Sequence, residues 1–159
     1  MITSIEGRIK GYWYGQGYIR TTSFEYTLNN SFTSVHLTND AVQKHLPEYG
    51  KYEKGNKISY EDFQKYLDKE YNGKYDFFSS IYPKIRKIAT DSIRACCLNI
   101  DPERKGHNFE IFGLDFMIDS DFHPWLIEVN NNPCLELSCP LLNTIIPDML
   151  ENAFRYNII

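Results

Sequence analysis

The sequence contains no long hydrophobic run, and this absence narrows the class of protein. No stretch approaches the roughly 20 consecutive apolar residues that span a bilayer. The opening residues, "MITSIEGRIK", carry no apolar core of the kind that a secretory signal needs. We therefore expect a soluble, intracellular protein with no membrane partner.

Basic residues are not in excess. The 17 Lys and Arg residues are outnumbered by 21 Asp and Glu residues, which gives a formal net charge of −4. General nucleic-acid binding favours a basic stripe, so no nucleic-acid partner is expected. Local basic clusters do occur in "YPKIRKIATDSIR" and "PERKGH", and a basic face of this kind can meet an acidic partner.

Cysteine is scarce, and its spacing does not indicate a redox motif. The four cysteines are Cys96, Cys97, Cys134 and Cys139, and no two of them form a CxxC pair. We expect reduced thiols, as is usual in the cytosol.

Apolar and aromatic residues, by contrast, are plentiful. The chain has 159 residues, of which 42% are hydrophobic, with 12 Tyr and 10 Phe among them. This is enough for a packed core in one domain or part of one. The sequence shows no internal repeat and no low-complexity linker.

Short β-prone runs and helical patterns follow each other along the chain. Residues 1–26 predict strands at "TSI", "GRIKGYWY" and "GYIRTT". "DAVQKHL" predicts one or two helical turns, and Ser59 is a good N-cap for "YEDFQKYLDKEY". A longer helix is predicted over residues 79–98 with Pro83 in its first turn, and "LLNTIIPDMLENAFRYNII" predicts a closing helix. The predicted fold class is α+β, an antiparallel sheet with helices packed on one face, in which strands from the two ends of the chain join.

Residues 109–133, "FEIFGLDFMIDSDFHPWLIEVNNNP", predict a β-hairpin with one carboxylate in each strand. "FEIFGLDFMI" alternates as a strand, "DSDFHP" supplies the turn and "WLIEVN" is the return strand. The shortest symmetric closure pairs Ile118 with Trp125. In that register, Asp115 lies opposite Glu128.

The same register adds an amide to the two carboxylates. Asn130 lies two residues after Glu128, on the same face, and opposite Gly113, which has no side chain to block it. Opposed residues have Cβ atoms roughly 4.5–5.5 Å apart, and two carboxylates at that distance share a proton or a cation. Oxygen ligands of this kind suit Mg²⁺ with phosphates, and no Cys or His lies beside them to favour zinc. The hairpin therefore predicts a magnesium–phosphate site, with solvent-facing carboxylates as the alternative.

Four ordered motifs resemble those of the tubulin–tyrosine ligase-like family. "FGLDFMIDSDFHPWLIEVNNNP" resembles the last metal-binding hairpin of that family. Upstream, "GYIRTTSFEY", "SVHLTNDAVQK" and "YGKYEKGN" resemble successive family motifs, so that the matches run over about residues 8–156. The resemblance implies an ATP-grasp fold.

The resemblance also implies a reaction, its cofactors and its partners. Family members use ATP and Mg²⁺ to activate a carboxylate as an acyl phosphate, which the amine of an amino acid then attacks. The amino acid could be tyrosine, glutamate or glycine, and the implied acceptor is tubulin, in microtubules or free, or a similar acidic protein. We expect a cytoplasmic protein, with cilia or the microtubule cytoskeleton as candidate sites.

The site residues follow from the matching motifs. The resemblance implies that Asp115, Glu128 and Asn130 are magnesium ligands, and that Glu128 and Arg20 are catalytic. Arg20 would face the carboxylate substrate and the phosphates, which a guanidinium can grip bidentately. The implied nucleotide contacts are His36, Leu37, Thr38, Asn39 and Ile127.

Residue type alone allows simpler interpretations of three of these positions. Arg20 could be an exposed arginine at a strand end. Thr38 and Asn39 could cap a helix, which is a common use of both residue types.

The matched motifs are the later ones of the family. We therefore expect residues 1–159 to be a single partial domain, the C-terminal portion of the catalytic domain without its upstream lobe. Half of a cleft orients ATP poorly. Two functions stay open: a ligase, or a non-catalytic remnant that binds tubulin or another partner without turnover. An ATP-grasp ligase outside tubulin modification is a third.

Overall fold

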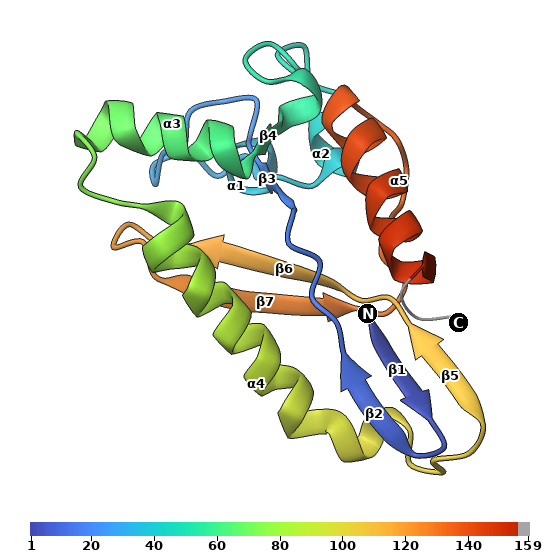
Figure 1. Ribbon diagram of the computed structural model, residues 1–159. Coiled ribbons are helices and arrows are strands. Elements are labelled where there is room, and N and C mark those ends of the chain that lie inside the picture. Colours follow the sequence, from blue (N-terminus) through green and yellow to red (C-terminus); the bar gives the residue numbers. More distant parts are fainter. Residues whose placement is uncertain (156–159) are drawn as a thin grey trace.

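Three small antiparallel sheets make up the β structure of the part of the chain that the computed structural model describes, residues 1–155. The first sheet has the order β2-β1-β5, the second pairs β3 with β4, and the third pairs β6 with β7 (Figure 1). The strands are β1 (Ile2–Ile5), β2 (Arg8–Gly11), β3 (Tyr18–Arg20), β4 (Lys57–Ser59), β5 (His107–Glu110), β6 (Gly113–Ile118) and β7 (Pro124–Asn130). Together with the helices they confirm the α+β class.

The expectation of one sheet is wrong. The run predicted as a single strand, residues 109–118, divides at residues 111 and 112 into β5 and β6. β5 pairs with β1, while β6 pairs with β7, so the two halves of the run belong to different sheets. The pairing of β1 with β5 confirms that strands from distant parts of the chain join. An alternating pattern cannot show this division, because each half alternates equally well.

The helices begin and end close to the predicted positions. They are α1 (Thr33–His36), α2 (Asp40–Gln43), α3 (Tyr60–Tyr71), α4 (Tyr82–Ile100) and α5 (Pro140–Arg155), with a 3-10 turn η1 (Lys54–Asn56) and a π-turn η2 (Phe77–Ile81). None of these helices, within residues 1–155, is long and apolar enough to cross a membrane.

Local chemistry explains where the longer helices start. The main-chain N–H of Asp62 donates to the Ser59 hydroxyl at 3.0 Å, which confirms Ser59 as the N-cap of α3. Pro83 lies in the first turn of α4, where a missing N–H is harmless. The last four residues of the predicted closing helix, 156–159, lie outside the described part of the chain, and Pro147 lies inside α5.

The main core lies where α3, η2 and α4 meet the β6–β7 hairpin. Leu67, Phe77, Ile81 and Ile85 are buried together, and Phe116 of β6 packs against them. Burial of such side chains is worth about 1.5–3 kcal/mol each. The hairpin is therefore supported by a helical layer, which Figure 1 shows beside it.

The segment 12–17 carries the chain from β2 to β3 past the hairpin (Figure 1). The indole N–H of Trp13 donates to the Tyr82 hydroxyl at 2.8 Å, and that hydroxyl donates to the carbonyl of Gly15 at 2.9 Å. A Cβ on Gly17 would lie 2.2 Å from the hydroxyl oxygen of Tyr60. Glycine is therefore needed for this close approach, which places β3 above the hairpin.

Candidate functional site

The β6–β7 hairpin brings the two predicted carboxylates together. Asp115 pairs with Glu128, and Gly113 pairs with Asn130, so both predicted pairings are confirmed. A Cβ on Gly113 would lie 2.9 Å from the Cβ of Pro133. The glycine thus allows the chain after β7 to fold back over β6, close to Asn130.

The register changes towards the turn. The predicted pairing of Ile118 with Trp125 is wrong, since Ile118 pairs with Pro124. The difference arises because Ile127 has no partner in β6, and one extra residue in a strand is a β-bulge that bends the strand and increases its twist. Ile127 is 59% exposed and lies directly before Glu128. The bulge therefore adjoins the carboxylate pair, and its one-residue shift of register brings Asp115 opposite Glu128.

Arg20 reaches this pair from another sheet. Its Nη2 lies 2.6 Å from Oδ2 of Asp115, with the Arg20 side chain 28% exposed and that of Asp115 33% exposed. The amide of Asn130 donates to Oε1 of Glu128 at 3.3 Å. Arg20 is therefore not a free surface arginine at a strand end, because it contacts one of the opposed carboxylates.

Tyr18, on the same strand as Arg20, adds a neutral group. Burial raises the pKa of the Tyr18 phenol, an effect that the nearby charge of Arg20 partly opposes. A phenol whose pKa lies above 10 stays protonated at neutral pH. Tyr18 can thus donate a hydrogen bond without adding negative charge.

A broad cleft joins most of the predicted site residues. Its volume is about 2300 Å³, larger than the roughly 300–1,000 Å³ of a typical small-molecule site, so it has room for more than one ligand. Two predicted nucleotide contacts, Leu37 and Ile127, are not among the residues that line it. The predicted residues that do line it are Arg20, His36, Thr38, Asn39, Asp115, Glu128 and Asn130.

The "HLTN" segment begins at His36, the last residue of α1, and leads into α2. The ring of His36 makes an edge contact with Tyr26 at 5.5 Å between centroids, and its Nε2 contacts the carbonyl of Asn30. Asn39 occupies the N-cap position of α2, but its side chain makes no capping hydrogen bond. The amide of Asn39 is therefore available to a ligand in the cleft.

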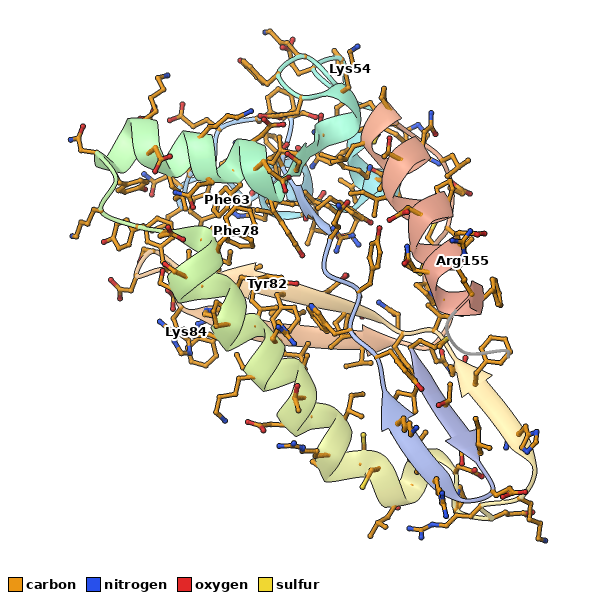
Figure 2. The ribbon with its side chains drawn as sticks, viewed as in Figure 1. Lys54, Phe63, Phe78, Tyr82, Lys84 and Arg155 are labelled. Carbon is orange, nitrogen blue, oxygen red and sulfur yellow. The ribbon has the colours of Figure 1, made fainter. Side chains whose placement is uncertain are left out.

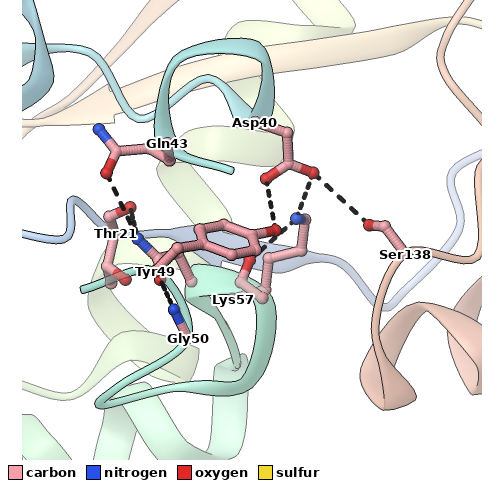
Figure 3. A network of polar contacts seen from close by, with 9 residues as sticks. Thr21, Asp40, Gln43, Tyr49, Gly50, Lys57 and Ser138 are labelled. Atoms are coloured by element: carbon pink, nitrogen blue, oxygen red, sulfur yellow. Dashed lines mark hydrogen bonds and ion pairs between the residues drawn. The ribbon is translucent and has the colours of Figure 1, made fainter. Parts of the chain in front are cut away.

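A buried polar network holds this segment in place (Figure 3). Gln43 is 0% exposed. Its Oε1 accepts from the main-chain N–H of Ser23 at 2.7 Å, and its Nε2 donates to the carbonyls of Ser34, at 3.0 Å, and Leu37. One side chain thus connects the segment after β3 to the chain on either side of His36.

Asn56 forms the second half of the network. Its Nδ2 donates to the Ser23 hydroxyl at 3.0 Å and to the carbonyl of Thr21 at 3.3 Å. Its Oδ1 accepts from the main-chain N–H of Gly50 at 2.8 Å. These bonds fix the chain directly after Arg20, and so they help to hold the guanidinium over the hairpin.

An ion pair between a buried lysine and a partly exposed aspartate completes this region, since the Asp40 side chain is 36% exposed. Nζ of Lys57 lies 2.6 Å from Oδ2 of Asp40, and the Lys57 side chain is only 2% exposed. The Tyr49 hydroxyl also donates to Asp40, at 3.3 Å, and Ser138 lies 3.5 Å from the same carboxylate (Figure 3). The carboxylate of Asp40 thus offsets the charge of the buried Lys57, which would be costly without a partner.

The sequence carries almost no mark of these supporting residues. Gln43, Asn56 and Lys57 are residue types that are usually exposed, so nothing in a hydropathy pattern marks them as buried. Asn56 does lie in "YGKYEKGN", one of the motifs that resemble the family, and this position is the one signal in the sequence that could have identified it.

The comparison with known families gives the same result as the ordered motifs. The sequence model of the Tubulin-tyrosine ligase family matches residues 1–159. The chain belongs to this family. Membership confirms the resemblance found along the sequence.

Several curated proteins are similar to this member of the tubulin-tyrosine ligase family. Tubulin glycylase 3A of Drosophila melanogaster is 38% identical over 149 residues, which are 91% of this chain and 14% of that protein. Tubulin glycylase 3B of Tetrahymena thermophila is 34% identical over 147 residues, 91% of this chain and 12% of that protein. The human protein named Inactive polyglycylase TTLL10 is 30% identical over 157 residues, 92% of this chain and 23% of that protein. The chain thus spans less than a quarter of each relative.

The hairpin side chains of this member of the tubulin-tyrosine ligase family fit magnesium better than a softer metal. Asp115, Glu128 and Asn130 offer only oxygen atoms as ligands, which hard cations prefer. Within residues 1–155, no group of three or more His, Cys, Asp or Glu side chains could hold a metal ion. A cation at the hairpin would therefore need further oxygens from a ligand, as Mg²⁺ commonly takes from phosphates.

Proposed function

We propose that this chain carries the metal- and phosphate-binding part of an ATP-dependent ligase that adds an amino acid to tubulin or a similar acidic protein. The observation that carries the proposal is the pairing of Asp115 with Glu128 in a cleft that also contains Arg20. Two opposed carboxylates repel each other unless a cation lies close to them. A guanidinium beside them adds a grip for phosphate or carboxylate.

Each residue has a distinct role in this proposal. Asp115, Glu128 and Asn130 would hold Mg²⁺ through their side-chain oxygens. Arg20 would orient the acceptor carboxylate and neutralise its charge, since a guanidinium matches carboxylate geometry with two parallel hydrogen bonds. When bound, ATP–Mg²⁺ would supply the phosphoryl group that converts the acceptor carboxylate into an acyl phosphate, which an amine can attack.

The nucleotide would lie against the "HLTN" segment. Thr38 and Asn39 line the cleft with polar side chains that suit ribose or phosphate, and His36 lines it as well. We assign Leu37 and Ile127 to the edge of the nucleotide site, where their exposed apolar side chains would meet the base.

The fold that we propose for the whole catalytic unit is ATP-grasp, with residues 1–159 as its C-terminal lobe. The α+β arrangement and the short coverage of the relatives, such as 14% of the Drosophila protein, support a partial domain. The upstream lobe would then cover the open side of the cleft and exclude water from it.

Glycine is the amino acid that we favour. The relatives from Drosophila and Tetrahymena are named tubulin glycylases, at 38% and 34% identity. Tyrosine and glutamate are the other two candidates. The names also support tubulin as the acceptor. A ligase that modifies tubulin would act in the cytoplasm or on the microtubule cytoskeleton.

A non-catalytic role is the second candidate. The human relative at 30% identity is named an inactive polyglycylase. In this alternative the chain would bind tubulin or another partner without turnover. The oxygen ligands Asp115, Glu128 and Asn130 favour the ligase, because a binding remnant has no need of an opposed carboxylate pair.

Titration calorimetry of ATP–Mg²⁺ into the purified chain tests the metal site. Glu128→Gln and Asp115→Asn keep the size of each side chain but remove a charged ligand, and we expect each to weaken binding at least about tenfold. Glu110→Gln is the matched control, because Glu110 is exposed on β5, in a different sheet. Equal affinity in all four proteins would contradict the assignment of the hairpin as the metal site.

A transfer assay tests the reaction. The chain is incubated with tubulin, ATP–Mg²⁺ and radiolabelled glycine, tyrosine or glutamate in parallel. The proposal expects incorporation of glycine that Arg20→Ala abolishes. Tight ATP–Mg²⁺ binding without transfer of any of the three amino acids would instead support the non-catalytic alternative.

A further inference from the structure

The outer face of α4 is strongly basic. Lys84, Arg86, Lys87 and Arg94 are exposed there, whereas the buried face of the helix carries Ile85 and Ala89. Within α4, Asp91 is the one acidic residue. The face thus carries four cations and one anion in a chain whose formal net charge is −4. Figure 2 shows Lys84 on the outer edge of the helix.

Only part of this charge is offset within the described residues. Lys87 pairs with Asp91 at 2.5 Å, and the charge of Arg94 also acts on Asp91. Lys84 and Arg86 form no ion pair with any residue of 1–155. Four cations and one anion leave a local charge of +3, which an anionic partner would offset.

The basic face is continuous with the cleft that holds the candidate site. A shallow, open groove lies on it, lined by Pro83, Arg86, Lys87, Thr90, Asp91 and Arg94. Thr90 and Arg94 also line the larger cleft that contains Arg20 and Asp115. A chain lying on α4 can therefore continue into the cleft.

We propose that the outer face of α4 docks an acidic polypeptide segment, and that this segment belongs to the acceptor of the ligase. The span from Lys84 to Arg94 is ten residues of helix, about 15 Å, which matches about four or five residues of extended chain. Carboxylates spaced along such a segment can each meet one cation, and the guanidiniums of Arg86 and Arg94 can each grip a carboxylate bidentately. That the docked chain is the acceptor rests on the proposed function, whereas the docking itself does not.

The chemistry of the face favours a polypeptide over other polyanions. The groove contains no aromatic ring on which a nucleobase could stack. It contains no large apolar side chain that could enter a bilayer, which membrane-binding helices require. The pair of Lys87 and Asp91 interrupts the positive charge at its centre, which suits discrete carboxylates better than a continuous phosphate backbone.

Fluorescence anisotropy with a labelled oligoglutamate peptide tests the inference on the purified 159-residue chain. The variant carries Arg86→Gln and Arg94→Gln, and the matched control carries Lys65→Gln and Lys69→Gln, two exposed cations of α3. Both proteins lose the same charge from an exposed helix. We expect the α4 variant to bind about fivefold more weakly and the control to match the unmodified chain, with affinity falling as salt rises.

Other outcomes would overturn the inference. An equal loss of peptide affinity in both variants would mean that the peptide responds to overall charge. If α4 bound single-stranded DNA or phosphatidylserine vesicles as tightly as it binds the peptide, that result would mean a general polyanion surface. Amide chemical-shift mapping with the same peptide uses the unmodified chain, so it does not depend on the folding of the variants. Shifts confined to regions other than α4 would refute the docking site. ATP–Mg²⁺ titration of the α4 variant separates this result from the metal site, because that binding should be unchanged.

Discussion

The region from α3 to α4 is held together by apolar packing, whereas the region from β3 to β4 is held together by buried hydrogen bonds. In the first region the ring of Phe77 contacts Tyr60 at 4.7 Å and Phe63 at 5.7 Å between centroids. In the second, the most buried side chains include Gln43 and Asn56, which bond to the main chain around them.

The difference follows from the length of the elements. α1 and α2 have four residues each, too few to present an apolar stripe, whereas α4 has 19. Directional hydrogen bonds can instead fix an irregular chain in one conformation. The apolar region supports Asp115 and the polar region supports Arg20, so the contact between these two residues depends on both.

The largest effect is expected from breaking the apolar region. Phe77→Ala removes a ring that is 1% exposed, and should lower the free energy of unfolding by about 3–5 kcal/mol. Phe78→Ala is the control, because that ring is 43% exposed and should cost less than about 1 kcal/mol. Urea denaturation measures both, and similar losses would show that Phe77 is not at the centre of the core.

The polar region should be nearly as sensitive to a single side chain. Gln43→Ala leaves the N–H of Ser23 and the carbonyl of Leu37 without their partners, at a cost of about 2–3 kcal/mol. Hydrogen exchange should also become faster in residues 34–39. Gln16→Ala, at an exposed position, should change neither quantity. Unaltered exchange in the Gln43 variant would mean that the network does not fix the "HLTN" segment.

Ser59 lies at the junction of the two regions, as the last residue of β4 and the N-cap of α3. Ser59→Ala should destabilise the fold by about 1 kcal/mol, because the N–H of Asp62 loses its acceptor. Ser59→Thr keeps a hydroxyl that can accept from the N–H and donate to the carboxylate of Asp62, and should restore most of the stability. Thermal melts of the two variants check this, and equal melting temperatures would exclude a capping role.

The smallest change in the free energy of unfolding is expected where the two regions meet, and there the substitution should stabilise the fold. Glu128→Gln removes the repulsion of Asp115 but keeps the acceptor for Asn130, so in the presence of EDTA it should stabilise the fold by about 0.5 kcal/mol. Glu136→Gln, on an exposed loop, controls for the change in net charge. A lower melting temperature for the Glu128 variant would show that Arg20 already offsets the repulsion.

The parts of the molecule that could be predicted are those whose cause lies within a few residues. Ser59 caps α3 through a residue three positions away. Asp115 does lie opposite Glu128 as predicted, but only because the bulge at Ile127 offsets the one-residue change of register at the turn. The bulge at Ile127 could not be predicted, because a strand with one extra residue keeps a similar composition. The burial of Gln43 could not be predicted either, since its acceptors and donors lie 6 to 20 positions away.

The sequence by itself determined the hairpin, the longer helices and membership of the tubulin-tyrosine ligase family. Only the tertiary structure decided that residues 109–118 divide between two sheets, and that Arg20 meets Asp115 across 95 positions of sequence. The physical reason is the range of the interactions. Periodicity and capping act between neighbours in the chain, whereas a contact between two sheets depends on the packing of everything that connects them.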